Sequence, residues 1–540
     1  MRPNCNLIHL TVLTGLLACG GSGTKDTEDS SAPQIGDSDT ESDDTSSSSD
    51  ALSARLVDAI SIDGLIAHLD AFQVIADENG GNRNSGEPGF EASLDYATEQ
   101  FESFGYAVER DEFTFTNIEE LSDPALEQTA PNTQTYSDNQ FATFAYSGSG
   151  DVTASVQGVD LMLPPGDESN SSTSGCETED FDGFTSGNIA LIQRGTCTFQ
   201  TKVDNATAAG AVGVLIFNEG QSGRTEVVEG QLDAEVTNTV PTLGLSFNLG
   251  ETLAELIDAS GLTMRMKVDL ERVDTPAANL FVRTTTGRTD RQVVVGAHLD
   301  SVAAGSGIND NGTGSALILE LARAFSEINA SPENQVVFAL WGAEEWGLLG
   351  SIDWVFTLES DALSNIFANL NFDMIGSPNA GRFVYDGDGS SGGGAGPTGS
   401  DDIEEIFNNW FASKSLGYEA TPFNGRSDYG AFIYMGIPAG GLFTGAEGVM
   451  SGSQADKFGG VSGQAFDPCY HQACDDIDNV DADMFLEMSL AAAHATGEVA
   501  ARKDGWARSQ PLADLLARKD EIRAEVHKLG QCGHGGLPTE

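Results

Sequence analysis

Basic residues are scarce in this chain of 540 residues. Its 26 Lys and Arg face 83 Asp and Glu, which gives a formal net charge of −57 at pH 7. Contacts with nucleic-acid phosphates need clustered basic side chains, so this balance argues against a nucleic-acid partner. It also argues against electrostatic attraction to anionic membranes. The acidity favours solubility and carries no information about the fold.

Long apolar runs are also missing. No internal segment reaches the roughly 18 consecutive apolar residues of a transmembrane helix, so no internal membrane span is predicted. Apolar residues still make up 39% of the sequence, which is enough to build packed cores. A chain of this length is too long for one compact domain and predicts roughly two to four domains.

The N-terminal residues are typical of an export signal. Residues 1–19 combine Arg2 with a short apolar stretch that ends at Ala18 and Cys19. Such a stretch indicates a secretory signal rather than a spanning helix. The residues around Cys19 resemble a bacterial lipobox, which predicts a lipid anchor on Cys19 and a lipoprotein of the bacterial cell envelope. The alternative is an ordinary signal peptide with a nearby cleavage site, which predicts a secreted protein.

A polar segment follows the signal. Residues 20–54 are rich in Ser, Thr, Asp and Glu, and Ile35 is the single large apolar residue between positions 22 and 50. A segment of this composition buries too little surface to offset the entropy lost on ordering. We therefore predict a disordered linker at 20–54.

Cysteine is limited to seven residues: Cys5, Cys19, Cys176, Cys197, Cys469, Cys474 and Cys532. The first two belong to the export signal. Export permits disulfides, so we pair Cys176 with Cys197 and Cys469 with Cys474, which leaves Cys532 over. The alternative is a zinc-thiolate site, but the second pair of ligands that a structural zinc site requires is absent.

The chain after the linker divides into four parts. Residues 55–134 show helical patterns and a strand, and are predicted to form the N-terminal part of the main domain. Residues 135–270 are short β-rich runs broken by Gly, Ser and Pro. Between 271 and 502, strand and helix patterns alternate, as is typical of an α/β domain with a largely parallel sheet. Residues 503–540 predict an added helix, and no function is assigned to them.

The β-rich segment 135–270 resembles a known module. The stretch from Arg194 to Phe199, together with the Cys176 and Cys197 pair, closely resembles the protease-associated domain. The segment contains no conspicuous acid–base or ligand cluster. We interpret it as an inserted, non-catalytic domain.

Acidic residues and a histidine occur where three predicted strands of the α/β segment end, and a further Asp in a Gly-rich loop and a second His accompany them. Six of them stand out: His298, Asp310, Glu344, Glu345, Asp373 and His471. In open α/β sheets the carboxyl ends of the strands bind ligands. Each residue alone has an ordinary explanation, such as a core histidine, a helix N-terminus or a turn. Together, so many clustered carboxylates would be costly without a cation, and two imidazoles with carboxylates are typical of zinc.

The same six residues resemble the ligand and base set of the secreted co-catalytic di-zinc aminopeptidases. Their spacings of 12, 34, 28 and 98 residues and the segment 467–475 carry the resemblance, which covers about residues 60–503. It implies a three-layer zinc-exopeptidase fold with a central mixed, largely parallel sheet. It also implies two Zn²⁺ ions per chain. The implied ligands are His298 and Asp373 for one zinc, Glu345 and His471 for the other, and Asp310 as the bridge between them.

The family resemblance also implies catalytic roles. Glu344 is expected to act as general base on a water activated by the metals and to return the proton to the leaving amine. Tyr470 is expected to polarise the developing oxyanion. Asp300 is expected to orient His298 through the second ring nitrogen.

Two further positions are expected to bind the substrate. Arg426 lies in the loop 424–428, which resembles the wall that holds the free amino group of the substrate. Phe443 matches an apolar wall of the side-chain pocket. Both assignments rest on the resemblance, and a surface loop and a core aromatic are the alternatives.

The combined prediction is an exported zinc aminopeptidase that removes N-terminal, preferentially apolar, residues from peptide or protein substrates. A dipeptidase or carboxypeptidase of the same superfold is an alternative, and Arg426 is the nearby cation that could bind a substrate carboxylate in such an enzyme. A catalytically inactive surface-binding module is a second alternative. The sequence does not predict an oligomeric state.

Overall fold

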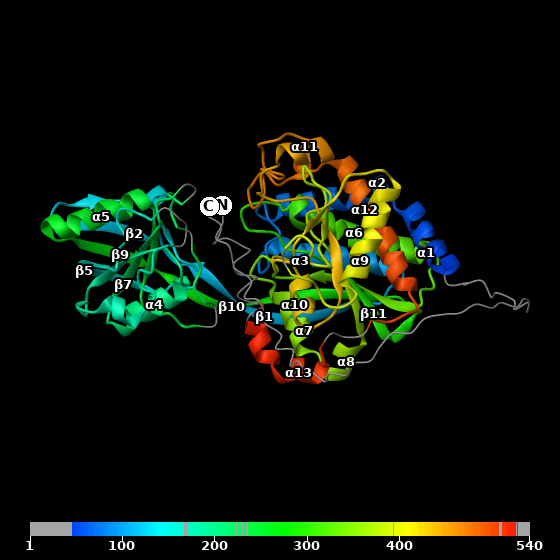
Figure 1. Cartoon of the computed structure of the whole chain (residues 1–540), viewed down its shortest axis with the longest axis horizontal. Helices are drawn as coiled ribbons and strands as arrows, with labels where there is room; N and C mark the ends of the chain where they lie inside the picture. Colours follow the sequence, from blue (N-terminus) through cyan, green and yellow to red (C-terminus); the bar gives the residue numbers. More distant parts are fainter. Residues whose placement is uncertain are drawn as a thin grey trace, which may run out of the picture.

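The structure is a computed structural model that describes residues 46–526 apart from 167–170, 222–223, 229, 234–235, 393, 507–509 and 525. The predicted export signal with Cys19, most of the predicted linker, and Cys532 therefore lie outside the described residues. The described chain forms two sheet-based bodies that lie side by side (Figure 1).

The larger body is built on a mixed sheet of eight strands. Their order is β1 (Glu109–Glu120), β10 (Leu270–Arg283), β12 (Asn334–Trp341), β11 (Arg288–His298), β13 (Ile366–Phe372), β16 (Ala439–Phe443), β14 (Phe383–Tyr385) and β15 (Glu419–Thr421). The four central strands β12, β11, β13 and β16 are parallel to one another, and β10 and β14 run antiparallel to their central neighbours. The predicted mixed, largely parallel sheet is confirmed.

Helices cover both faces of this sheet, which gives three layers (Figure 1). Along β11, Val293 and Val295 point into one apolar core while Val294 points into the other, because successive strand residues face opposite sides. The first core contains residues of α1 (Ser46–Ala59), α2 (Ile62–Glu78), α3 (Pro88–Ser103), α6 (Thr313–Glu327), α9 (Ser400–Ser413) and α12 (Ala482–Ala501). The second contains residues of α7 (Leu349–Thr357), α8 (Ser360–Asn365), α10 (Tyr429–Tyr434) and α13 (Leu512–Ala517).

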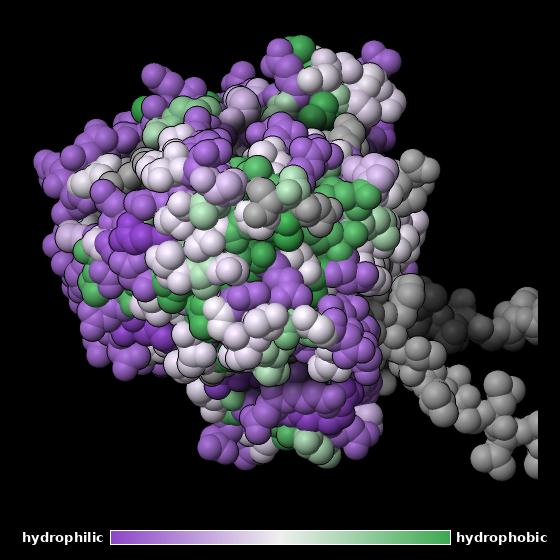
Figure 2. All heavy atoms as spheres, turned by 90° about the vertical axis from the view of Figure 1, so that its left-hand side faces the viewer, coloured by the Kyte–Doolittle hydropathy of each residue, from purple (hydrophilic) through white to green (hydrophobic). Residues whose placement is uncertain are grey.

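The smaller body has its own sheet of eight strands. Their order is β3 (Gln134–Thr135), β2 (Ala125–Ala130), β9 (Thr263–Val268), β5 (Gly150–Val159), β6 (Ile189–Gln193), β7 (Gly213–Phe217), β8 (Thr242–Leu245) and β4 (Phe141–Thr143). The helices α4 (Phe199–Ala208) and α5 (Phe247–Ser260) pack beside it (Figure 1). Figure 2 looks onto the free end of this body, where hydrophilic residues surround a hydrophobic area.

The two bodies are joined by an antiparallel ribbon of β1 and β10, in which Glu109 pairs with Phe281 and Glu120 pairs with Leu270. The smaller body starts earlier than the predicted boundary at residue 135, because β2 already pairs with β9 of its sheet. The sequence prediction missed this crossing because the partner of β2, strand β9, lies far along the chain and local patterns do not show the pairing.

The linker is shorter than predicted. Helix α1 begins at Ser46, so the last part of the predicted disordered segment 20–54 is helical. Leu52 and Leu56 lie four residues apart and are buried in the first core. The hydroxyl of Ser53 also donates to Glu498 of α12 at 2.7 Å. These contacts compensate for the conformational entropy that the segment loses when it folds into a helix.

The predicted tail helix exists as α13, and it packs onto the second face of the sheet. Leu515, Ile522 and Val526 are buried in the second core. The tail therefore completes the core of the larger body.

No single helix in the described part of the chain is both long and apolar enough to cross a membrane. Only the bent pair of α1 (from Ala51) and α2 meets the length and hydropathy criteria jointly.

Both predicted disulfides are present. Cys176 is bonded to Cys197 in the smaller body, and Cys469 is bonded to Cys474 in the larger one. The alternative of a zinc-thiolate site is therefore wrong for these four residues.

Candidate active site

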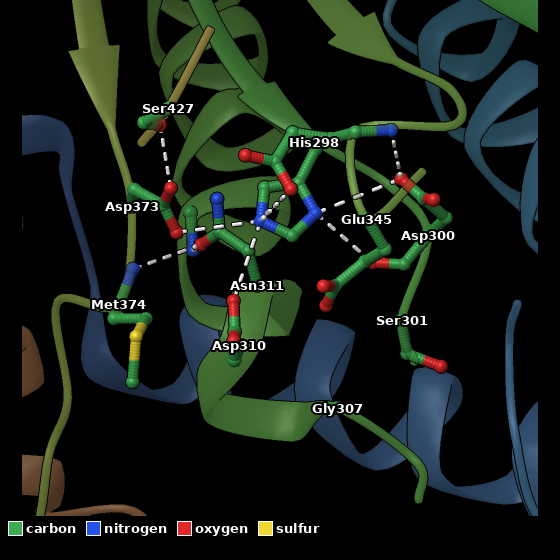
Figure 3. A network of polar contacts seen from close by, with 12 residues as sticks. His298, Asp300, Ser301, Gly307, Asp310, Asn311, Glu345, Asp373, Met374 and Ser427 are labelled. Atoms are coloured by element: carbon green, nitrogen blue, oxygen red, sulfur yellow. Dashed lines mark hydrogen bonds and ion pairs between the residues drawn. The ribbon is translucent and has the colours of Figure 1, made fainter. Parts of the chain in front are cut away.

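The candidate site lies at the carboxyl ends of the central parallel strands. His298 is the last residue of β11, Glu344 and Glu345 follow β12, and Asp373 follows β13 directly. Because these three strands are neighbours and parallel, their carboxyl ends bring the side chains to one edge of the sheet. Figure 3 shows His298 between Asp373 and Glu345.

The other two predicted ligands come from loops. Asp310 lies in the turn Ile308–Gly312, which leads directly into α6, and its own backbone is not helical (φ −109°, ψ 90°). His471 lies inside the loop closed by the Cys469–Cys474 disulfide and has a backbone φ of +58°. That conformation is unfavourable for a residue with a side chain.

The carboxylate of Asp310 lies between the two imidazoles. Its Oδ1 is 3.3 Å from Nε2 of His298, and its Oδ2 is 3.3 Å from Nε2 of His471. On the first side, Asp373 Oδ1 is also 3.3 Å from His298 Nε2. On the second side, Glu345 Oε2 is 3.1 Å from His471 Nε2. The five predicted ligands thus form two sets that share Asp310.

These distances fit zinc. Neighbouring ligand atoms of a tetrahedral zinc ion lie roughly 3.3 Å apart, given bonds of about 2.0–2.1 Å to nitrogen and oxygen. The donor set of imidazole and carboxylate is also the one zinc prefers. Asp373 Oδ1 is buried and has no hydrogen-bond partner within the described part of the chain. The residues present therefore suit a pair of cations.

The electrostatics of the site also favour cations. Burial lowers the pKa of His298, but the surrounding carboxylates, Glu344 first, outweigh burial and raise it well above the usual value. Burial also lowers the pKa of His471, but Tyr470 and then the carboxylates of Glu345 and Asp310 raise it well above the usual value. The negative charge that favours protonation of these buried imidazoles would equally favour a metal ion in place of the protons.

Glu344 lies on the His298 side, with Oε2 at 3.7 Å from Nε2 of His298. Its side chain is 1% exposed. Burial raises the pKa of Glu344 well above the usual value, and the neighbouring carboxylates of Asp428 and Asp373 add to this, against the lowering effect of His298. A raised pKa suits a group that must accept and return a proton near neutral pH.

The contact predicted between Asp300 and His298 differs in detail. The backbone carbonyl of Asp300 lies 3.1 Å from Nδ1 of His298, within hydrogen-bond distance, whereas its carboxylate Oδ1 lies 3.6 Å away. The same Oδ1 accepts a hydrogen bond from the backbone N–H of Glu344 at 3.2 Å. Asp300 therefore contacts both the imidazole of His298 and the loop that carries Glu344.

A pocket of about 490 Å³, partly open to solvent, lies above these residues. Its walls include the predicted residues Arg426, Phe443 and Tyr470. Arg426 forms an ion pair with Glu447 at 3.2 Å and donates to the hydroxyl of Tyr470 at 3.1 Å. All the residues predicted for catalysis or substrate binding, other than the buried Asp300, thus line the pocket or form its metal-binding floor.

The sequence analysis missed several residues that hold the site. Ser427 donates to Asp373 Oδ2 at 2.5 Å, and Asp475 accepts from the backbone N–H of Asp310 at 2.9 Å (Ser427 is labelled in Figure 3). The fully buried Arg83 contacts the loop between His298 and Asp310. Ser427 and Asp475 stand beside residues that were singled out, but hydroxyl and carboxylate contacts of this kind have no sequence signature of their own.

Known proteins resemble the chain over most of its length. An aminopeptidase of Pseudomonas aeruginosa is 44% identical over 434 residues, which cover 80% of each chain. A Mycobacterium tuberculosis protein named "Probable lipoprotein aminopeptidase LpqL" is 37% identical over 446 residues, which cover 81% of this chain and 85% of the other.

Solved structures agree with these relatives. An aminopeptidase from Aneurinibacillus sp. strain AM-1 aligns with a TM-score of 0.66 at 25% identity, over 85% of this chain and 98% of its own. BSAP, a zinc aminopeptidase from Bacillus subtilis, has the same fold, with a TM-score of 0.59 at 21% identity over 83% of this chain and 97% of its own.

Two family profiles match the chain. Residues 157–253 match the PA domain, which confirms the predicted protease-associated domain. Residues 279–496 match Peptidase family M28. Together with the relatives, these matches confirm the prediction of a zinc-dependent aminopeptidase with an inserted domain. The chain belongs to peptidase family M28.

Proposed function

We propose that this M28 peptidase is an exported aminopeptidase that works with two zinc ions and prefers apolar N-terminal residues. The observation that carries the proposal is the position of Asp310, whose two carboxylate oxygens each lie 3.3 Å from a different imidazole. A carboxylate placed in this way can bridge two ions, as in two-metal hydrolases.

The proposed ligands divide between the two ions. His298 and Asp373 would hold one zinc, Glu345 and His471 would hold the other, and Asp310 would contact both. When bound, zinc supplies Lewis acidity, which polarises the scissile carbonyl and lowers the pKa of water. All other steps fall to the side chains of the protein.

Glu344 is the proposed general base. It lines the pocket beside His298 and is buried, so its carboxylate can take a proton from the attacking water and deliver it to the leaving amine. Tyr470 is the proposed oxyanion partner. The Tyr470 hydroxyl accepts a hydrogen bond from Arg426 at 3.1 Å, and its own O–H is the donor proposed for the oxyanion.

The pocket favours an amine over a carboxylate. Its floor is lined by Asp310, Glu344 and Asp373, whose negative charge suits the N-terminal amine of a peptide. Arg426, the cation that a carboxypeptidase or dipeptidase would need, is already engaged by Glu447. This ion pair supports the aminopeptidase over the alternatives of the same superfold.

The pocket walls support a preference for apolar side chains. Met374, Phe443 and Ala446 line the pocket beside the metal-binding residues. Relatives from Arthroderma otae and Trichophyton rubrum that are 38% identical over 67% of this chain carry the name leucine aminopeptidase 2.

Export to the cell envelope is supported by the lipobox-like residues around Cys19 and by the name of the mycobacterial relative, which calls it a lipoprotein.

Metal analysis and matched peptides test the proposal. We expect two zinc ions per chain, and cleavage of a leucine-initiated peptide that continues after C-terminal amidation and stops after N-terminal acetylation. Cleavage that survives acetylation but stops on amidation would indicate a carboxypeptidase. Absence of both metal and cleavage would indicate the inactive binding module.

A further inference from the structure

A turn from the N-terminal part of the chain reaches the backbone of the active-site loops. Arg83, Asn84 and Ser85 lie between α2 and α3, well outside the segment 279–496 that matches the peptidase family. Arg83 and Ser85 are fully buried, and Asn84 is 5% exposed. The charged and polar groups of this turn must therefore find partners inside the protein.

The partners of Arg83 lie on the segment between His298 and Asp310. Its Nε donates to the carbonyl of Ser306 at 2.9 Å, its Nη2 donates to that of Gly307 at 2.7 Å, and its Nη1 donates to that of Leu299. One guanidinium thus holds both ends of the segment that connects two proposed zinc ligands. A flexible ammonium group could not match this planar fork of donors.

The rest of the turn extends these contacts to a second loop. Asn84 donates to the carbonyl of Ser301 at 2.7 Å, on the segment that Arg83 also holds. Ser85 accepts from the backbone N–H of Ala343 at 2.8 Å, directly before Glu344. The turn therefore joins the loop after β11 to the loop after β12.

The charge of Arg83 also bears on the site. The acidic groups that act on it are Asp300, Asp475, Glu345 and Asp310. Burial lowers the pKa of Arg83 to about 10, so the side chain remains a cation at neutral pH. Its Cζ lies 4.9 Å from the centroid of the Phe72 ring, so the guanidinium also packs against an aromatic face.

We infer that Arg83, Asn84 and Ser85 are positioning residues that hold the loops after β11 and β12 in the geometry that binds zinc. None of the three is among the proposed metal ligands or lines the pocket. Their contribution is to keep the ligand loops in place before the metal binds, so that little of the binding free energy is spent on ordering them. The inference rests on the proposed function.

Two variants and a control test it. Arg83→Lys keeps the positive charge but loses the fork, and Ser85→Ala removes a single acceptor. The control is Arg323→Lys, since Arg323 on α6 also donates to a backbone carbonyl, that of Ala59, and pairs with Glu320 away from the ligand loops. For each protein, zinc affinity is measured by competition with a chelator, and the melting temperature is measured with zinc and after chelation.

The expected result is a loss of zinc binding that exceeds the loss of stability. Arg83→Lys should weaken zinc affinity by about 10-fold or more, the usual scale for a group that supports a metal ligand. The rise in melting temperature on zinc binding should shrink accordingly. Ser85→Ala should show the same pattern more weakly, and Arg323→Lys should lower both melting temperatures equally without changing zinc affinity.

A purely structural role predicts another outcome. If Arg83→Lys lowers both melting temperatures equally and keeps the affinity of the wild type, as the control does, the inference is overturned. If Arg83→Lys does not fold, Ser85→Ala decides by the same comparison. Failure of the proposed function would be distinct, because the wild-type protein itself would then lack two zinc ions.

Discussion

Glu344 and Glu345 are adjacent, yet they face different imidazoles. Glu345 lies 3.1 Å from His471, whereas Glu344 lies 3.7 Å from His298 on the other side of Asp310. The assigned roles predict that Glu344→Gln keeps both zinc ions while kcat falls by at least about 100-fold, because the variant lacks a base. Elemental analysis and steady-state kinetics of the purified variant check this.

The neighbouring position predicts the opposite pattern. Glu345→Gln removes an anionic ligand, so one zinc should weaken or be lost, and added zinc should restore part of the activity. Added zinc should not rescue Glu344→Gln. Loss of metal from the Glu344 variant with full retention in the Glu345 variant would mean that the two roles are exchanged.

At this scale the sequence was informative where chemistry dictates the residue type. Imidazole and carboxylate are common zinc ligands, and the ends of neighbouring parallel strands lie at one edge of the sheet, so the residue type and position of His298 and Asp373 indicated a metal site. The partners of Arg426 could not be predicted, since the sequence does not show that Glu447 would neutralise it. Arg83 could not be singled out from the sequence, because its backbone partners are more than two hundred residues away along the chain.

Helices α2 and α3 meet at a buried histidine. Nδ1 of His68 lies 2.7 Å from the hydroxyl of Tyr96, and burial lowers the pKa of His68 from 6.5 to about 4. Between pH 6.5 and about 4, His68 is therefore protonated in the unfolded chain but neutral in the folded chain. Stability that is fully present above pH 6.5 should be lost as the pH falls to about 4, by roughly 3 kcal/mol at most.

Replacement of the imidazole tests this contribution. His68→Gln keeps a polar group near Tyr96 but does not titrate, so the free energy of unfolding should fall less steeply between pH 6.5 and 4. Tyr96→Phe is the matched control, because it keeps the buried imidazole and should keep the steep acid limb. Denaturant unfolding across this pH range gives the comparison, and equal slopes in His68→Gln and wild type would contradict the prediction.

The disulfide loop around His471 makes a second prediction at the scale of elements. Replacing Cys469 and Cys474 with Ser opens a short loop, which should cost roughly 2 kcal/mol of stability by the loss of chain constraint. The larger effect should fall on zinc, because the left-handed backbone of His471 is no longer held. Chelator competition measures it, and unchanged zinc affinity in the double variant would show that the loop does not position His471.

Elements were predicted best where the apolar period was regular. The strand and helix patterns that alternate between 271 and 502 correspond to β11, α6, β12, β13 and α9, because the apolar residues of the helices follow one face and the strands are continuous apolar runs. Contacts between distant segments decided the rest. Helix α1 extends into a polar stretch because Leu52 and Leu56 reach α12, and β2 joins the smaller sheet because it pairs with β9.

At the scale of the whole molecule, the inserted domain is attached through the β1–β10 ribbon. Thr116 pairs directly with Asp274 on this ribbon, so an Asn-Gly turn could join these residues and replace 117–273. No proposed ligand or pocket residue comes from the removed segment. We expect this variant to keep its zinc and to hydrolyse a small leucine amide with kcat within about 3-fold of the wild type. Loss of zinc or of this activity would show that the inserted domain supports the site.

The proposed lipid anchor makes a separate prediction for the intact cell. Wild-type protein should partition with membranes and carry a lipid on Cys19, whereas Cys19→Ala should not be lipidated. Mass analysis of the N-terminal peptide and cell fractionation check this. Soluble secretion of the wild type, with its N-terminus at another residue, would favour the ordinary signal peptide.

The proposed zinc ligands are scattered along the chain, and this affects when the metal can be captured. Asp310 and His471 lie 3.3 Å apart in the folded chain although they come from distant segments, so a metal can contact both only after these segments have folded together. Metal capture is therefore a late event in the maturation of the chain. If the chain completes its folding after export, the metal that enters the site is drawn from the supply outside the cytoplasm. The growth medium, rather than the metal homeostasis of the cytoplasm, would then decide how much of the enzyme becomes active.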